Sequence, residues 1–202
     1  MYNFDGSNDY VSIPLMTIRA CVFQFRPYVT NRSLMGHTQI TNPRMDYTGG
    51  NVVSLVTNEG ASNSPSGVLF GRKNIVGVSC DGTNEFWNLN GTTGSTALGV
   101  QPLSINAIGR YRFNRYWAGQ MFDALLFEDA LTQAELASLV TDLSAVTADR
   151  HYTMLEGSGL VAVDVESGEN GSLVGVDEPD FHGELGGTAG ALPGFPLSRV
   201  VN

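Results

Sequence analysis

Apolar and polar residues alternate with a period of two along most of the chain. In the stretch TIRACVFQF, residues 17–25, both sets of alternate positions are apolar. One face would carry Ile18, Ala20 and Val22, and the other Cys21, Phe23 and Phe25. Two apolar faces are typical of a strand held between two layers. NVVSLVTN, from Asn51, alternates in the same way, so the pattern predicts an all-β protein.

Turn dipeptides divide one region into three consecutive antiparallel strands. In NIVGVSCDGTNEFWNLNGTTGSTAL, Asp81-Gly82 and Asn90-Gly91 each stand between strand-like runs. Both dipeptides tolerate positive φ and are typical of hairpin turns. The stretch therefore predicts a three-stranded meander.

A helical period occurs once, in DALTQAELASLVTDL. Thr132 can cap the first turn, Glu135 completes a capping box, and Leu131 and Leu136 can form a hydrophobic staple. We therefore expect one short surface helix, starting near Thr132, beside an antiparallel two-sheet sandwich.

Several phrases resemble laminin-G-like, concanavalin A-like jelly rolls of the lectin and glucanase superfamily. They are FDGSNDYVSIP (residues 4–14), IRACVFQFRP (18–27), VSCDGTNEFWNLNGT (78–92) and IGRYRFNRYWAGQMFDALLFEDALTQAELASLV (108–140). They occur in the family's order over roughly residues 3–140. The resemblance implies an all-β, antiparallel two-sheet jelly-roll sandwich with one short surface helix, of a kind also found in phage virion proteins.

The composition changes after residue 146, where glycine becomes frequent and aromatic residues rare. This divides the chain into a jelly-roll domain, residues 1–146, and a C-terminal arm, residues 147–202. The phrase HYTMLEGSGLVAVDVESGENGSLVG, from His151, resembles one that usually precedes FDGSNDYV in such modules. The chain therefore resembles a circularly permuted module. We expect HYTML to pair with the closing strand around residues 121–127, within the same chain or in a neighbouring copy.

Composition and charge narrow the function classes. The chain has 202 residues, a net charge of −9 and only 15% charged residues, which argues against nucleic-acid binding. No apolar stretch is long enough for a membrane helix. The N-terminus lacks the pattern of a secretory signal, so synthesis in a host cytoplasm is expected. Cys21 and Cys80 lie in apolar runs and are predicted to be buried thiols.

No catalytic motif is evident, so the chain is predicted not to be an enzyme. Retaining glycosidases of this fold use two carboxylates from one strand with an E-x-D-x-x-E pattern, which is absent. Asp164, Glu166 and Glu169 in VDVESGE are flanked by glycine and are interpreted as a turn. The histidines are scattered, and no nucleophile or phosphate-loop motif is present.

No cofactor is expected to be required, but a structural calcium ion is a candidate because related jelly rolls often carry one. Calcium takes carboxylate and carbonyl oxygens from loops. The candidate ligands are Asp5 and Asp9 in the opening turn and Asp123 on the closing strand. The alternative is that Asp5 and Asp9 bond only within their own turn.

The segment GRYRFNRYWAG, residues 109–119, combines basic and aromatic residues. On one strand, Arg110, Arg112 and Asn114 would share a face opposite Tyr111, Phe113 and Arg115. Aromatic and arginine side chains are enriched in binding sites, and rings stack on sugars. The candidate binding residues are Arg110, Tyr111, Arg112, Phe113, Arg115, Tyr116 and Trp117. The alternative is that the rings are part of the core.

Two function classes follow from these features. The first is a non-enzymatic structural protein of a phage virion, as a capsid decoration, fibre or tail component, forming homo-oligomers or contacting other virion proteins. Attachment to cell-surface glycans is compatible with that class. The second is a soluble carbohydrate-binding module or lectin. Neither class involves nucleic acid or membrane insertion.

Overall fold

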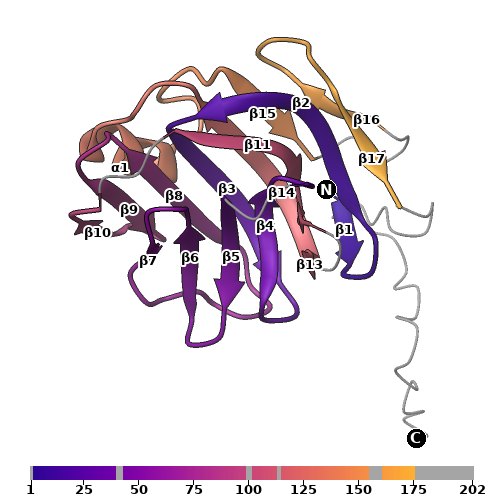
Figure 1. Cartoon of the computed structure of the whole chain (residues 1–202), viewed down its shortest axis with the longest axis horizontal. Coiled ribbons are helices and arrows are strands. Elements are labelled where there is room, and N and C mark those ends of the chain that lie inside the picture. The colour runs from indigo at the N-terminus through magenta and orange to yellow at the C-terminus, as the bar shows by residue number, and fades with distance from the viewer. Residues whose placement is uncertain (1, 40–42, 99–101, 113–114, 155–160, 176–202) are drawn as a thin grey trace, which may run out of the picture.

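Two antiparallel β-sheets face each other across an apolar core in the computed structural model, which describes residues 2–39, 43–98, 102–112, 115–154 and 161–175 (Figure 1). Sheet A has the order β10 (Thr92–Thr96), β9 (Glu85–Leu89), β8 (Asn74–Cys80), β3 (Ala20–Pro27), β14 (Ala118–Phe127) and β15 (Arg150–Thr153), and β1 (Tyr2–Asp5) also pairs with β14. Sheet B has the order β17 (Gly171–Val174), β2 (Tyr10–Ile18), β11 (Leu103–Ile108), β4 (Arg32–Gly36), β5 (Arg44–Thr48), β6 (Val52–Val56) and β7 (Ala61–Asn63).

Strand β16 (Val161–Asp164) pairs with both β15 and β17, so it joins the two sheets along one edge. A separate hairpin is formed by β12 (Arg110–Tyr111) and β13 (Arg115–Tyr116), and the helix α1 spans Gln133–Thr141. The predicted all-β, antiparallel two-sheet jelly-roll sandwich with one short helix is confirmed. The helix among the described residues is too short to cross a membrane.

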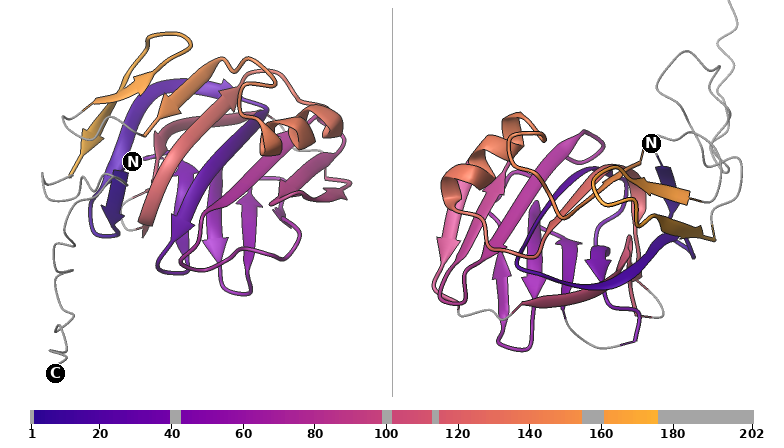
Figure 2. Two further views of the ribbon diagram at one scale, coloured as in Figure 1. Left: turned by 180° about the vertical axis from the view of Figure 1, so that it is seen from behind. Right: turned by 90° about the horizontal axis from the view of Figure 1, so that it is seen from above.

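Strand β3 has two apolar faces, as its alternation predicts. Cys21, Phe23 and Phe25 belong to the main core between the sheets. Ala20 and Val22 belong to a second apolar cluster, under α1 on the outer side of sheet A (Figure 2). Ile18 differs from the expectation, because it ends β2 and faces the main core. The chain changes sheets at this point, which interrupts the alternation.

The predicted meander is present as β8, β9 and β10, paired antiparallel in that order. Asn90 and Gly91 have φ values of 51° and 87° in the second turn, as the dipeptide predicts. Cys21 and Cys80 are buried free thiols, also as predicted.

The helix begins as its sequence predicts. Thr132 is the N-cap: its hydroxyl accepts a hydrogen bond from the Glu135 N–H, and the Glu135 carboxylate accepts one from the Thr132 N–H. Leu131 and Leu136 are both buried in the cluster under the helix. The capping box and the burial of one helical face together hold α1 on sheet A.

The C-terminal arm pairs with the closing strand within the same chain. Asp123 to Leu126 of β14 lie opposite Thr153 to Arg150 of β15. Strand β1 occupies the remainder of the same edge of β14, where Tyr2 lies opposite Met121 and Asp5 opposite Ala118. The N-terminal strand and the arm therefore cover the edge of β14 together.

The arm also lies beside the N-terminal strands. Ser172, Leu173 and Val174 of β17 pair with residues 12, 11 and 10 of β2. The Tyr2 hydroxyl donates a hydrogen bond of 2.7 Å to the carbonyl oxygen of Val161. The described parts of the HYTML…LVG phrase, residues 151–154 and 161–175, thus lie next to FDGSNDYV in space, which is the arrangement expected of a permuted module; Leu155 lies outside the described residues. The division at residue 146 stays a prediction.

Candidate functional site

Residues 110–111 and 115–116 pair as the two strands of a hairpin, rather than lying on the single strand that their alternation suggested. Arg110 pairs with Tyr116 and Tyr111 with Arg115, and Arg112 in the turn has a φ of 50°. The predicted division into two faces is therefore wrong. A Cβ on Gly36 would lie 3.1 Å from the Arg110 carbonyl oxygen and 3.2 Å from the Tyr111 Cβ. This glycine allows the hairpin to lie directly over β4.

The hairpin places an arginine against two tyrosine rings. The Arg110 guanidinium carbon lies 4.5 Å from the ring centroid of Tyr10 and 5.3 Å from that of Tyr116. The two ring centroids are 6.3 Å apart. The Arg110 Nε–H also donates to the Arg112 carbonyl oxygen at 2.6 Å. All three side chains of this Tyr10–Arg110–Tyr116 stack are half-buried, so they are ordered by contact and still reach the surface.

A buried carboxylate fixes the hairpin to sheet B. Asp46 is 2% exposed. Its Oδ2 accepts hydrogen bonds of 2.8 Å from both Arg44 Nε and Arg115 Nη1. Its Oδ1 accepts one of 2.5 Å from the Ser33 hydroxyl. The Arg44 guanidinium carbon also lies 4.8 Å from the Tyr111 ring centroid. Asp46 therefore connects β4, β5 and the hairpin.

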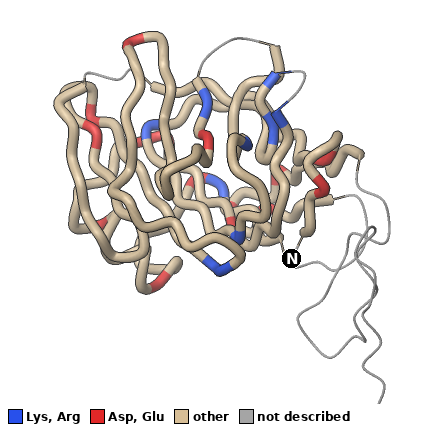
Figure 3. Tube along the Cα trace, turned by 90° about the horizontal axis from the view of Figure 1, so that it is seen from below, with Lys and Arg blue, Asp and Glu red and all other residues tan. Residues whose placement is uncertain are grey.

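Basic residues gather in this part of an acidic chain. Of the eleven Lys and Arg residues, five lie on β4, β5 and the hairpin: Arg32, Arg44, Arg110, Arg112 and Arg115. Asp46 neutralises part of their charge. Figure 3 shows several basic positions grouped together, whereas many acidic positions lie toward the periphery of the view. A local excess of positive charge in a chain of net charge −9 favours an anionic ligand at this position.

The remaining members of the predicted aromatic site have different positions. Trp117 is fully buried in the main core, with its ring centroid 5.4 Å from that of Phe25 in an edge-to-face contact. Tyr111 is also buried. These two rings are therefore buried, in agreement with the alternative that the rings are part of the core. Phe113 lies outside the described residues.

The three predicted calcium ligands are not gathered in one place. Asp9 Oδ2 accepts from the Asp5 N–H at 2.7 Å, and Asp5 Oδ1 accepts from the Ser7 N–H at 2.6 Å. Asp123 lies farther along β14, where its Oδ1 is 3.0 Å from His151 Nε2. Within the described ranges no group of three or more His, Cys, Asp or Glu residues is placed to hold a metal. Calcium binding stays a prediction, which a calcium-dependent melting temperature would test.

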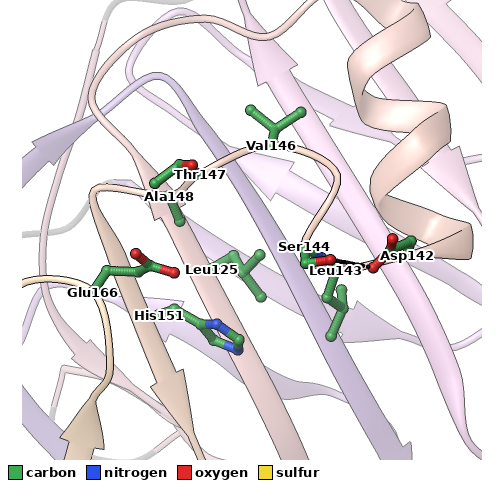
Figure 4. A pocket seen from close by; sticks show the side chains of 9 residues that line it. All are labelled: Leu125, Asp142, Leu143, Ser144, Val146, Thr147, Ala148, His151 and Glu166. Carbon is green, nitrogen blue, oxygen red and sulfur yellow. Dashed lines mark hydrogen bonds between the residues drawn. The ribbon is translucent and has the colours of Figure 1, made fainter.

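A pocket of about 480 Å³ lies on the outer side of sheet A, between the loop that follows α1 and the C-terminal arm (Figure 4). Its lining residues are Leu125, Asp142, Leu143, Ser144, Val146, Thr147, Ala148, His151 and Glu166. Glu166 and His151 lie on one side, and Asp142 and Ser144 on the other. The sequence does not reveal this pocket, because its walls come from β14, the loop after α1, β15 and the turn of the arm, which only the fold brings together.

VDVESGE contains a turn at residues 165–167, as predicted, and Asp164 holds it in place. Asp164 Oδ1 accepts from the backbone N–H groups of His151 at 2.9 Å and Glu166 at 3.1 Å. Burial alone would raise the pKa of Asp164, but hydrogen bonds from Ser167 and these N–H groups outweigh it and lower the pKa. Asp164 is therefore a charged structural centre that connects the turn to β15.

Comparisons with known proteins identify the fold. No family model matches the sequence, and no curated protein matches it. Among solved structures, a candidate carbohydrate-binding protein of Bacteroides ovatus has a TM-score of 0.63 at 18% identity over 86% of this chain. The chain spans 58% of that protein.

Two further structures share the fold. A heptameric SAP-like pentraxin of Limulus polyphemus has a TM-score of 0.52 at 13% identity, covering 68% of this chain and 80% of its own. The CBM40 of a Ruminococcus gnavus IT-sialidase, bound to α2,3-sialyllactose, has a TM-score of 0.51 at 12% identity. The match covers 68% of this chain and 96% of the CBM40. The chain therefore has a lectin-like jelly-roll fold of the kind found in carbohydrate-binding domains.

Proposed function

We propose that the chain is a non-catalytic glycan-binding module that holds an acidic saccharide on the outer face of sheet B, beside the β12–β13 hairpin. The observation that carries this proposal is the half-buried Tyr10–Arg110–Tyr116 stack within a group of five arginines. The lectin-like fold supports a binding role but does not by itself identify a ligand.

The stack offers the two contacts that an acidic sugar needs. A tyrosine face can lie against the C–H groups of a pyranose ring. An arginine fork can bind a carboxylate or sulfate through two hydrogen bonds. Because Arg110 already contacts both rings, little conformational entropy remains to be lost when a ligand binds.

Glycan-array screening followed by titration calorimetry tests the proposal. Arg110→Gln is expected to weaken binding of an acidic saccharide by at least about tenfold, since a hydrogen bond to a charged group contributes ~1.5–3 kcal/mol. Arg72→Gln is the matched control, because Arg72 is exposed in the loop before β8 and belongs to none of β4, β5 and the hairpin. Equal losses in both variants, or no binding by the wild type, would refute the proposal.

A second candidate function is a structural part of a phage virion, as a capsid decoration, fibre or tail component assembled with other copies or other virion proteins. An exposed apolar group favours an assembly role. Tyr28 and Val29 are 40% and 42% exposed, and Leu69 and Phe70 are 51% and 57% exposed. The two loops are joined by a 2.9 Å hydrogen bond from Gly71 N–H to the Pro27 carbonyl oxygen. Exposed apolar groups of this kind often mark protein interfaces.

Mass photometry tests the assembly candidate. The wild type is expected to form oligomers, and Phe70→Asp is expected to shift them toward monomer while glycan binding is unchanged. A wild type that is monomeric at every accessible concentration would contradict self-assembly and leave the glycan proposal intact.

A further inference from the structure

The pocket between the α1–β15 loop and the C-terminal arm is an open hollow that is large enough for a small molecule. Its volume of about 480 Å³ lies within the range of roughly 300–1,000 Å³ typical of ligand pockets. Leu125 and Ala148 are buried at its base, and Leu143 and Val146 are partly buried beside them. Polar groups are confined to its sides, so a ligand with an apolar body and polar ends would fit it.

The charge of the lining is negative. Asp142 and Glu166 stand on opposite sides of the pocket, and no Lys or Arg is among the lining residues (Figure 4). The Ser144 side chain and N–H both donate to Asp142 Oδ1 and lower the pKa of that carboxyl, so Asp142 is ionised at neutral pH. The neighbouring Arg150 does not neutralise Glu166, because it pairs with Asp164 at 3.5 Å and Glu169 at 2.6 Å.

The walls are fixed before a ligand arrives. Asp164 binds the N–H groups of both His151 and Glu166, so the turn of the arm keeps its place against β15. His151 is held in turn by Asp123, with 3.0 Å between Nε2 and Oδ1. A preformed pocket costs little ordering entropy when a ligand binds.

From these features we propose that the pocket binds a small organic cation, in which a primary ammonium group is attached to a body of a few carbons. The ammonium would pair with the Glu166 carboxylate on one side, the carbon body would cover Leu125 and Leu143, and the other polar end of the ligand would face Asp142 on the opposite side. Two sources share this chemistry, an amino sugar and an aliphatic amine of the lysine or polyamine type. The site is separate from the arginine-rich face of sheet B and does not depend on the function proposed for it.

Titration calorimetry with cadaverine and with glucosamine tests the proposal on the full chain. N-acetylglucosamine, which lacks the charge, is expected not to bind in the pocket. Saturable binding of either amine is expected, and Glu166→Gln is expected to weaken it by about tenfold or more, as loss of one charge-assisted contact implies. The amine that binds more tightly identifies the source.

Two matched variants make the result specific. Glu128→Gln removes the same charge from an exposed residue outside the pocket and is expected to leave amine binding unchanged. Thr147→Trp would fill the exposed side of the pocket and is expected to abolish it. The proposal is overturned if neither amine binds saturably to the wild type. It is also overturned if Glu128→Gln weakens binding as much as Glu166→Gln, since binding would then follow only the net charge of the chain. Binding of acidic glycans should be unaffected by all three variants.

Discussion

Replacement of Trp117 by alanine tests whether the aromatic–arginine segment supports the core or an interface. The Trp117 side chain is 0% exposed and contacts Phe25 edge to face, so its removal leaves a large cavity between the sheets. Trp→Ala changes in cores cost about 3–5 kcal/mol. The free energy of unfolding of a domain is about 5–15 kcal/mol, so the variant should still fold but have a lower melting temperature. For a chain of this length the loss corresponds to a fall of roughly 6–20 °C in melting temperature.

A comparison of two Trp→Phe variants separates ring packing from hydrogen bonding. Trp87 is 1% exposed and donates from Nε1 to Glu85 Oε2 at 3.3 Å. The buried Trp117 Nε1 has no hydrogen-bond partner in the described part of the chain. Both changes remove similar ring area, but only Trp87→Phe removes a donor from a buried carboxylate. We therefore expect Trp87→Phe to cost about 1–3 kcal/mol more than Trp117→Phe.

Urea unfolding followed by circular dichroism gives the free energies, and mass photometry gives the oligomeric state. For Trp117→Ala we expect a lower midpoint, an unchanged slope and an unchanged particle mass. The reasoning is refuted if the variant keeps its stability to within about 1 kcal/mol, well below the cavity cost, while its particle mass falls. That result would make Trp117 an anchor between chains rather than a core residue.

Three further predictions concern the arm, a buried acid and the helix. Deletion of residues 149–202 removes the strand paired with β14 and should cause aggregation or loss of folding; a soluble product with an unchanged melting temperature would contradict this. Burial raises the pKa of Glu85 above its ordinary 4.5, so the folded state binds this proton more tightly than the unfolded state does. The contribution of Glu85 to stability should therefore fall as pH rises from about 4.5 through the folded-state pKa. The free energy of unfolding of Glu85→Gln, relative to that of the wild type, should therefore increase over that pH window. A difference in urea midpoints that does not change with pH would contradict this prediction. Thr132→Ala removes the helix N-cap and should lower the free energy of unfolding by about 1 kcal/mol in urea titrations, whereas Thr141→Ala at the other helix end should cost less.

Local features of the fold could be predicted because their causes lie within a few residues. The two-faced alternation of β3, the Asn90-Gly91 turn and the Thr132–Glu135 capping box depend on backbone sterics and short-range hydrogen bonds. The pairing of the arm with β14 was predicted from the order of the phrases, and the edge of β14 is covered as that order implies.

The candidate sites depend on which distant segments lie side by side, and that is decided only in three dimensions. The alternation of RYRFNRYW was compatible with one strand, but the space above Gly36 and the bonds to Asp46 hold it as a hairpin over β4. Tyr10 reaches Arg110 only because β2 and the hairpin meet at one end of sheet B. The acidic pocket likewise forms where the arm returns beside the loop after α1. Backbone preferences act over a few residues, so the sequence pattern shows them. A cavity or a group of like charges arises from contacts between distant segments, which the pattern of apolar and polar residues does not show.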